Sequence, residues 1–256
     1  MMHLGKFNWT LAVSIGALIL AGSALEMAPQ IGLKSPTVVA SRQPVAAGGG
    51  ASVALDTSSS SGAITTSSDY TIAITVAANA NRTLFVCAGS GVALGIDDIN
   101  GISSNVDGAF TEVSQASDAN WVNSQVWRLV SPTAGAHTIT VDVIGAAGQS
   151  VGFAISLYNV NTSDPDDAPA TSNGTGTAPT AAVTLTSTEM AIGMLFTDSA
   201  TGVSVTTGAQ RQEVENIASD TAGSLASNTG SGSVSLTWAT ANEGYAVVVV
   251  PVNSAP

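Results

Sequence analysis

The chain has 256 residues and a formal net charge of −12, because six lysines and arginines stand against eighteen aspartates and glutamates. Charged residues make up only 9% of it and hydrophobic residues 45%, which excludes the low-hydrophobicity, high-charge profile of a disordered protein. The acidic balance also excludes a nucleic-acid-binding surface, because a phosphate backbone would be repelled and no basic stripe is present.

Residues 1–25 have the features of an export segment. No charged residue occurs between Lys6 and Glu26, and the small residues Gly22-Ser23-Ala24 follow the apolar stretch. This order is typical of a secretory signal peptide with its cleavage site. The nineteen uncharged residues are also enough to span a bilayer, so a retained membrane anchor is the alternative. In both cases we predict that membrane contact is limited to residues 7–25 and that the remainder is extracytoplasmic: secreted, anchored at the cell surface or on a virion surface.

Residues 26–61 predict a flexible linker. They contain Pro29, Pro36, Pro44, a Gly48-Gly49-Gly50 triplet and the serine run 58–61. Such a composition cannot build a packed core of its own. We therefore expect a tether that holds the following domain away from a surface.

From residue 62 to residue 256, hydrophobic residues alternate with polar ones at the two-residue period of β-strands. Ile139, Val141 and Val143 share one face, for example, while Thr138 and Thr140 lie on the other. Gly, Asn, Asp and Pro interrupt these runs at short intervals, which is typical of an antiparallel β-sandwich and not of βαβ units. The predicted fold class is all-β, an antiparallel β-sandwich preceded by an N-terminal hydrophobic helix and the linker.

Two stretches of this domain, about 62–160 and 175–252, have similar sequence patterns in the same order. The matched segments are Leu84–Val86 with Met190–Ile192, Gly135–Val141 with Gly232–Trp238, and Phe153–Val160 with Tyr245–Val252. Two copies of one strand set, packed face to face, would bury both apolar faces in one core. The alternative is a coincidence of β patterning.

Two internal motifs and the closing strand carry a resemblance. They are Gly108–Val113, Val126–Val141 and the strand that starts at Tyr245. This pattern resembles a widespread, mostly uncharacterised group of exported bacterial and phage-borne β-sandwich proteins, over roughly Ile64 to Val252. The resemblance implies a jelly-roll or lectin-like sandwich on a cell surface, virion or large extracellular protein. The double glycine usual before the first motif is replaced by Asn105-Val106-Asp107-Gly108, which weakens the inference of a hairpin there.

Residues suited to catalysis are few beyond the export segment. His137 is the only histidine there and aligns with the inward-facing Val234, so we interpret it as a core residue; no Gly-x-Ser-x-Gly motif accompanies it. Cys87 lies in an apolar run, which is typical of a buried thiol. Paired carboxylates for glycoside hydrolysis are candidates by residue type alone: Glu112, Glu189, Glu213 and Glu215. We predict a protein that is not an enzyme.

Two acidic clusters are candidate calcium ligands. Their residues are Asp97, Asp98 and Asn100 in one turn, and Asp164, Asp166 and Asp167 between the two echoing stretches. Calcium prefers several hard oxygen ligands on a flexible loop. Neither cluster follows the Asp-x-Asp-x-Asp-Gly pattern, and turn formation by Asp and Asn is the alternative. No other cofactor is predicted.

Trp121, flanked by the polar Asn120 and Asn123, is the best candidate for stacking on a sugar ring, with burial under a loop as the alternative. Trp127 and Trp238 are interpreted as core residues. Three functional hypotheses follow. The first is a non-enzymatic structural or attachment module whose partners are other copies or neighbouring surface or virion proteins. The second is a carbohydrate-binding module for glycans, and the third is a secreted glycan hydrolase.

Overall fold

The computed structural model describes residues 50–65, 68–91, 99–118, 121–144, 148–200, 202–217 and 220–256. All regular structure in these residues is β, and all of it pairs antiparallel, which confirms the predicted all-β antiparallel class. No helix in the described ranges is long and apolar enough to cross a membrane. The predicted hydrophobic helix, with its signal or anchor, and the linker up to residue 49 lie outside the described residues.

The strands divide at residue 160 into two halves. The first half contains β1 (Ala54–Ser60), β2 (Tyr70–Val76), β3 (Thr83–Gly91), β4 (Ile99–Ser104), β5 (Gly108–Ala109), β6 (Thr111–Ser117), β7 (Val122–Val130), β8 (Gly135–Val143) and β9 (Gln149–Tyr158). The second half contains β10 (Ala170–Gly176), β11 (Thr180–Leu185), β12 (Met190–Thr197), β13 (Ser204–Thr207), β14 (Ala209–Ile217), β15 (Thr221–Thr229), β16 (Gly232–Ala239) and β17 (Glu243–Val252).

The two halves have the same strand order. Each has a five-stranded inner sheet, β1-β9-β3-β7-β6 in the first half and β10-β17-β12-β15-β14 in the second. Each also has an outer sheet, β2-β8-β4-β5 and β11-β16-β13 respectively. The predicted strand matches, β3 with β12, β8 with β16 and β9 with β17, therefore occupy corresponding places, and only the short β5 has no counterpart among the described strands.

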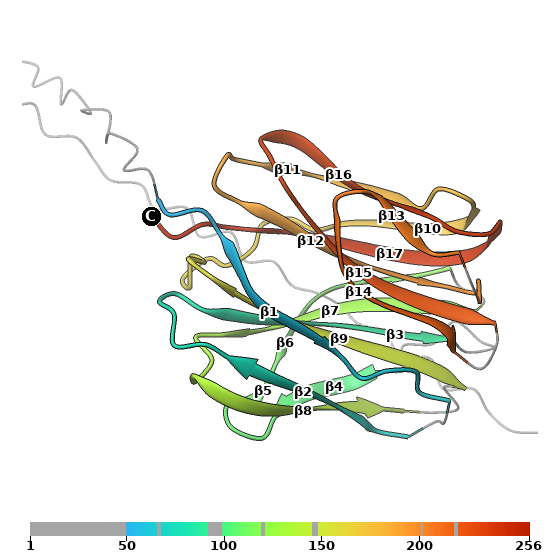
Figure 1. Ribbon diagram of the computed structural model, residues 1–256, viewed down its shortest axis with the longest axis horizontal. Coiled ribbons are helices and arrows are strands. Elements are labelled where there is room, and N and C mark those ends of the chain that lie inside the picture. The colour runs from blue at the N-terminus through green and yellow to red at the C-terminus, as the bar shows by residue number, and fades with distance from the viewer. Residues whose placement is uncertain are drawn as a thin grey trace, which may run out of the picture. The chain divides into compact units, whose positions relative to one another are not determined.

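The four sheets lie in layers, with the two inner sheets face to face and an outer sheet on each side (Figure 1). Three hydrophobic cores fill the spaces between the layers. The middle core joins the halves and includes Phe85, Phe153, Met194 and Val248. The two outer cores lie between the inner and outer sheet of each half. This differs from the single core expected from the sequence, because each half already contains two sheets.

The layering explains the two kinds of apolar pattern along the chain. Strands of the inner sheets are covered on both faces, so every residue of β12 is buried and the sequence there is almost continuously apolar. Strands of the outer sheets face solvent on one side, so buried and exposed residues alternate strictly along β2. Continuous and alternating runs are the patterns expected of fully and half-covered strands.

The structure corrects the predicted register within two of the matched strand pairs. Leu84 lies in the outer core of the first half, whereas its proposed match, Met190, lies in the middle core. Phe153 likewise faces the middle core, whereas Tyr245 packs against the outer core of the second half. An odd shift turns every side chain to the opposite face of a strand. Because both faces of these strands are apolar, the hydrophobic pattern alone did not reveal the shift.

Main-chain pairing gives the correct equivalence. Phe85 pairs with Ile155 of β9, Ile192 pairs with Val250 of β17, and all four face the middle core. Phe85 is therefore equivalent to Ile192. The match of Gly135 with Gly232 stands as predicted, because His137 and Val234, two residues further on, are both buried.

The folded domain begins earlier than the predicted linker boundary. Strand β1 (Ala54–Ser60) lies inside the range 26–61 and pairs along the edge of β9. Composition suggested a linker because serines fill this segment. In the structure, its main chain completes a sheet edge while its side chains stay half-buried, a role that needs few apolar residues.

Candidate functional site

The long strands run between two ends of the layered domain, and each end contains residues from both halves. We call one end the terminal pole, made of residues 50–53, 79–82, 159–167 and 253–256. We call the other end the loop pole, made of residues 117–118, 121–122, 144, 148–149, 197–200, 220–221 and 240–244. Thr83 and Met190 start β3 and β12 at the terminal pole, and their partner strands β9 and β17 end there.

The chain enters the domain at the terminal pole, beside its own C-terminus. Val53 donates its N–H to the carbonyl of Thr188 at 2.8 Å, and the Asn159 side chain donates to the carbonyl of Ser52 at 3.1 Å. A Cβ added to Gly50 would lie only 2.2 Å from the carbonyl oxygen of Ala255. These contacts hold the start of the described domain against Asn159, Thr188 and Ala255.

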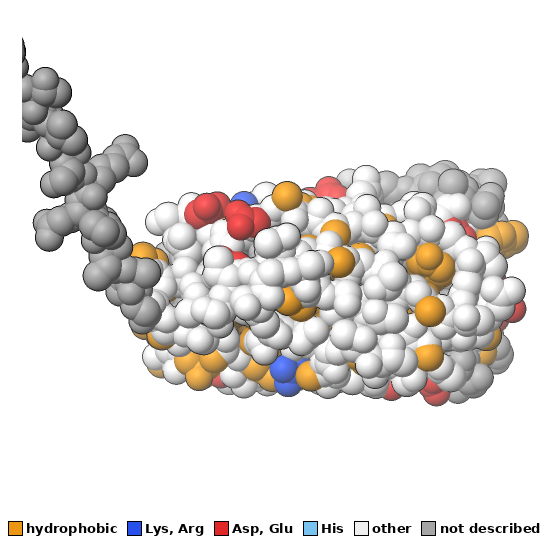
Figure 2. Space-filling view, turned by 90° about the horizontal axis from the view of Figure 1, so that it is seen from above, with side chains coloured by type: hydrophobic (Ala, Val, Ile, Leu, Met, Phe, Trp, Pro, Cys, Tyr) orange, Lys and Arg blue, Asp and Glu red, His pale blue; other side chains and the backbone are white. Residues whose placement is uncertain are grey.

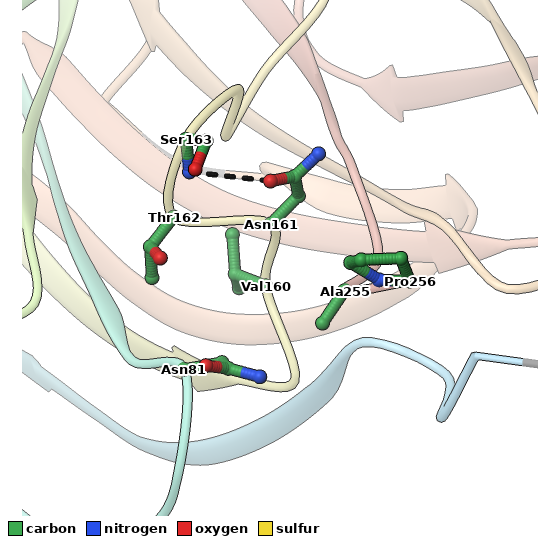
Figure 3. Close-up of a pocket in the computed structure, with 7 residues that line it drawn as sticks. All are labelled: Asn81, Val160, Asn161, Thr162, Ser163, Ala255 and Pro256. Carbon is green, nitrogen blue, oxygen red and sulfur yellow. Dashed lines mark hydrogen bonds between the residues drawn. The ribbon is translucent and has the colours of Figure 1, made fainter.

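A cavity of about 250 Å³ lies at this pole (Figure 3). Its lining comes from the β2–β3 turn, the connection between the halves and the last two residues: Asn81, Val160, Asn161, Thr162, Ser163, Ala255 and Pro256. The Ser163 N–H donates to Oδ1 of Asn161 at 3.2 Å, which closes the turn above the cavity. Because its side chains are amides, hydroxyls and aliphatic groups, the cavity offers hydrogen bonds but no acid–base group.

Trp121 stands at the loop pole and is 54% exposed, the highest value among the large hydrophobic residues that the structure describes. Oδ1 of Asp118 accepts the N–H groups of Trp121 and Val122, at 2.8 and 3.1 Å, and so holds the turn that presents the indole. Of its predicted neighbours, Asn123 is only 3% exposed and lies beneath the surface, and Asn120 lies outside the described residues. The structure therefore separates Trp121 from Asn123.

Carboxylates from both halves approach each other at the loop pole. Burial raises the pKa of Asp198, and the nearby charges of Asp220, Glu243 and Asp118 raise it further. A Cβ added to Gly244 would lie 2.8 Å from Oδ2 of Asp118, which shows how closely β17 approaches the β6–β7 turn. The result is a negative potential beside Trp121, which favours a basic or cationic partner.

The described calcium candidates are engaged mainly in contacts within the fold. Asn100 donates to Asp142 at 2.8 Å, and Asp97 and Asp98 lie outside the described residues. Asp166 forms an ion pair with Arg128, although burial raises its pKa overall. The main chains of Asp164 and Asp167 bond instead to the C-terminal strand region. Across the described ranges, no three His, Cys, Asp or Glu side chains are grouped so that they could hold a metal ion.

His137 has partners that the sequence did not reveal. Its Nε2 lies 2.7 Å from the carbonyl oxygen of Thr133, so Nε2 carries the proton and donates. Nδ1 lies 2.9 Å from the hydroxyl oxygen of Ser104, and the carboxylate of Asp107 lies 3.7 Å away. The ring thus ties the β4–β5 turn to the β7–β8 loop.

The carboxylate and hydroxyl around this histidine are themselves fixed by the turn. Burial raises the pKa of Asp107, but two hydrogen bonds from Thr133 and the charges of His137 and Arg82 outweigh it, so the net shift is downward. Ser104 is 6% exposed and accepts the N–H of Val106 at 3.2 Å. The hairpin is therefore present without the double glycine, and the signal for it was the Asn-Val-Asp-Gly turn, in which Gly108 adopts a φ of +82°.

Among the four candidate glutamates, only two are close together. Burial raises the pKa of Glu213, and a hydrogen bond and charge repulsion from Glu215 raise it further, against a hydrogen bond from Gln210. Both lie on the edge strand β14, whereas Glu112 belongs to β6 and Glu189 precedes β12, where it accepts the N–H of Thr186.

The outward rows of the two outer sheets are also alike. Thr71, Ala73 and Thr75 on β2 correspond to Thr180, Ala182 and Thr184 on β11, and all six are exposed. The face seen in Figure 2 is largely uncharged, with acidic side chains toward its margins. No protein-family model matches this chain, and neither a curated protein nor a solved structure matches it.

Proposed function

We propose that this protein is a structural or attachment module displayed outside the cytoplasm, on a virion or cell surface. The observation that carries the proposal is the position of the chain ends. Residue 50, the first described residue, lies at the terminal pole beside Ala255, so the loop pole is the opposite end of the domain along the strands. A domain tethered through residue 50 carries Trp121 and its acidic surroundings at the end opposite to the attachment point.

We also infer that each half is a jelly-roll sandwich. Numbered within one half, the inner sheet contains the first, eighth, third and sixth long strands in this order, and the outer sheet contains the second, seventh and fourth. This is the order of a jelly roll with two Greek keys. The chain between β4 and β7 divides between the sheets, since β5 pairs with β4 and β6 pairs with β7. Tandem jelly rolls suit rigid structural modules.

The charge distribution supports assembly through the outer faces. In the described residues three arginines stand against fifteen carboxylates, and each arginine is engaged within the chain, with a carbonyl, Asp166 or Ser227. Copies of such an acidic domain repel one another wherever carboxylates meet. The rows of threonine and alanine on the outer sheets avoid this repulsion, so neighbouring copies or other surface proteins are the expected partners.

The test is the location of the full chain in cells that produce it. Surface display predicts that protease added outside intact cells or purified virions removes the domain, and that antibodies against residues 50–256 label the surface. The matched control is a chain without residues 1–25, which stays inside and protected. A full-length chain that remains in the cytoplasmic fraction contradicts the proposal.

A carbohydrate-binding module is the second candidate, favoured by the exposed indole of Trp121. A glycan array with the folded domain tests it. Saturable binding that is lost in Trp121→Ala supports this candidate, provided that Ile144→Ala still binds. Ile144 is a suitable control because it is also at the loop pole and 46% exposed. Absence of binding on the array favours attachment through protein partners.

A further inference from the structure

The interface between the two halves has a glycine on one side directly against a phenylalanine on the other. A Cβ added to Gly89 of β3 would lie 2.5 Å from Cδ2 and 2.7 Å from Cγ of Phe196 on β12, and 2.7 Å from Cε of Met194. These separations are shorter than van der Waals contact between carbon atoms. The ring of Phe196, which is fully buried in the middle core, therefore occupies the space that a side chain at position 89 would need.

Gly89 and Phe196 also occupy the same position in the two halves. Gly89 follows Phe85 by four residues on β3, and Phe196 follows Ile192 by four residues on β12. Phe85 and Ile192 are equivalent by main-chain pairing, so Gly89 and Phe196 are equivalent too. Equivalent residues meet each other only at the axis of a two-fold arrangement. The halves therefore pack like the subunits of an isologous dimer, with this pair at the centre.

The two cross-strand rows that contain this pair differ in the order of large and small residues. Across β7, β3 and β9 of the first half, the row is Ser124, Gly89 and Val151. Across β15, β12 and β17 of the second half, the row is Gly223, Phe196 and Ala246. The first row is low at its centre and the second row is high at its centre, so the two rows are complementary in shape.

A second contact shows that these rows lie against each other. A Cβ added to Gly223 would lie 2.5 Å from Cγ1 of Val151, which is the largest side chain of the first row. Val151 thus packs on a glycine of the second half, just as Phe196 packs on a glycine of the first half. Each half supplies a large residue at the point where the other half supplies none.

The same geometry is unfavourable for two like halves. Two first halves would place Gly89 opposite Gly89 and leave a void at the centre of the interface, which is costly in a packed core. Two second halves would place Phe196 opposite Phe196, where there is room for one ring, and overpacking is costly as well. Only the pairing of a first half with a second half fills the centre once.

We propose that Gly89 and Phe196 make the inner face of each half selective for the other half. The partner that fits the inner face of a first half is the inner face of a second half, and neither face fits its own kind. Selectivity of this type needs an element that opposes the wrong pair as well as one that favours the right pair. Where copies of the chain are concentrated, it prevents like halves of different copies from pairing through their inner sheets.

The four combinations of glycine and phenylalanine at these positions test the proposal in the whole chain. Phe196→Gly places glycine at both positions, and we expect Tm to fall by roughly 6–20 °C. Gly89→Phe places phenylalanine at both and should lower Tm through overpacking. The double variant Gly89→Phe with Phe196→Gly has an unlike pair again, so it should recover more than half of the summed loss. A double variant whose loss is additive or larger would overturn the proposal, because each residue would then be needed only at its own position.

A smaller substitution gives a second test, which holds even if Gly89→Phe does not fold. Gly89→Ala should lower Tm beside Phe196 and raise it in the Phe196→Ala background, where the methyl group enters the space that the ring has left. Gly101→Ala is the matched control, because no atom lies within 4 Å of its added methyl group, and it should change Tm equally in both backgrounds. If Gly89→Ala also has equal effects in both backgrounds, the two positions are not matched and the proposal is wrong.

Discussion

Gln125 and Ser224 occupy the same position in the two halves, and each accepts the indole N–H of a tryptophan. Trp127 Nε1 donates to Gln125 Oε1 at 2.8 Å, and Trp238 Nε1 donates to Ser224 Oγ at 3.1 Å. The two tryptophans are not equivalent, since Trp127 belongs to an inner sheet and Trp238 to an outer one. Each half thus has one tryptophan in its outer core. The two tryptophans come from different layers, but the side chain that accepts the indole N–H lies at the same position in both halves.

Ser224→Ala should destabilise the protein, because it leaves the N–H of the fully buried Trp238 without an acceptor. We expect a loss of about 1–3 kcal/mol in the free energy of unfolding, measured by urea denaturation. Combining the change with Trp238→Phe gives the control. The phenyl ring has no N–H to satisfy, so Ser224→Ala should cost much less in that background. Equal costs in both backgrounds would show that the hydrogen bond does not stabilise the fold.

Sequence periodicity predicted which segments form strands better than it predicted how the strands of the two halves align. Alternation fixed the faces of β8 and β16, where one side meets water, so the match of His137 with Val234 was correct. It failed for β12, where both faces are buried and a shift leaves the pattern unchanged. Pairing between distant strands decides the register there, and one sequence does not display it.

Candidate site residues were harder to predict, because exposure depends on which loops cover them. Trp121 and Asn123 are two residues apart, and polar neighbours suggested that both lie at the surface. The structure exposes the first and buries the second, since β7 starts between them. The partners of His137 were missed for a related reason. Ser104 lies 33 residues away, and only the pairing of β4 with β8 brings it within reach.

Cys87 should react with thiol reagents only when the domain unfolds. The side chain is fully buried in the middle core, and burial raises the pKa of its thiol to about 12. The reactive thiolate is therefore almost absent at pH 8 in the folded state. Labelling followed by mass spectrometry in increasing urea should follow the unfolding transition seen by tryptophan fluorescence. Rapid labelling of the single cysteine in native buffer would contradict the buried position.

Gly223→Ala should weaken the contact between the halves. Gly223 belongs to β15, and a Cβ there would lie 2.5 Å from Val151 Cγ1 and 3.3 Å from Phe153, both on β9 of the other inner sheet. Overpacking of this kind costs about 1–3 kcal/mol. Gly101→Ala is the matched control, because no atom lies within 4 Å of the added methyl group. The difference between the two variants in thermal unfolding measures how tightly the inner sheets pack, and equal stability would argue against close packing at this point.

Asp198→Asn should stabilise the protein at neutral pH and not at acidic pH. Burial and then the charges of Asp220, Glu243 and Asp118 raise the pKa of Asp198 in the folded state. The folded protein therefore holds this proton more tightly than the unfolded chain, and stability is lost as pH rises through the raised pKa. Asparagine removes that loss, so its advantage is complete above the folded pKa and vanishes below the unfolded value of about 4.

Solvent screens this partly exposed group, so we expect a gain of no more than about 1 kcal/mol at pH 7. Urea unfolding of both proteins at pH 7 and at pH 3.5 measures the gain in stability above the folded pKa and its absence below the unfolded pKa. Because three of the four causes are charges, added salt should reduce the gain at pH 7. Glu243→Gln serves as the companion variant, since it removes one of those charges and should change stability in the same direction. A gain for Asp198→Asn that is equal at both pH values would mean that the substitution acts through packing and not through charge.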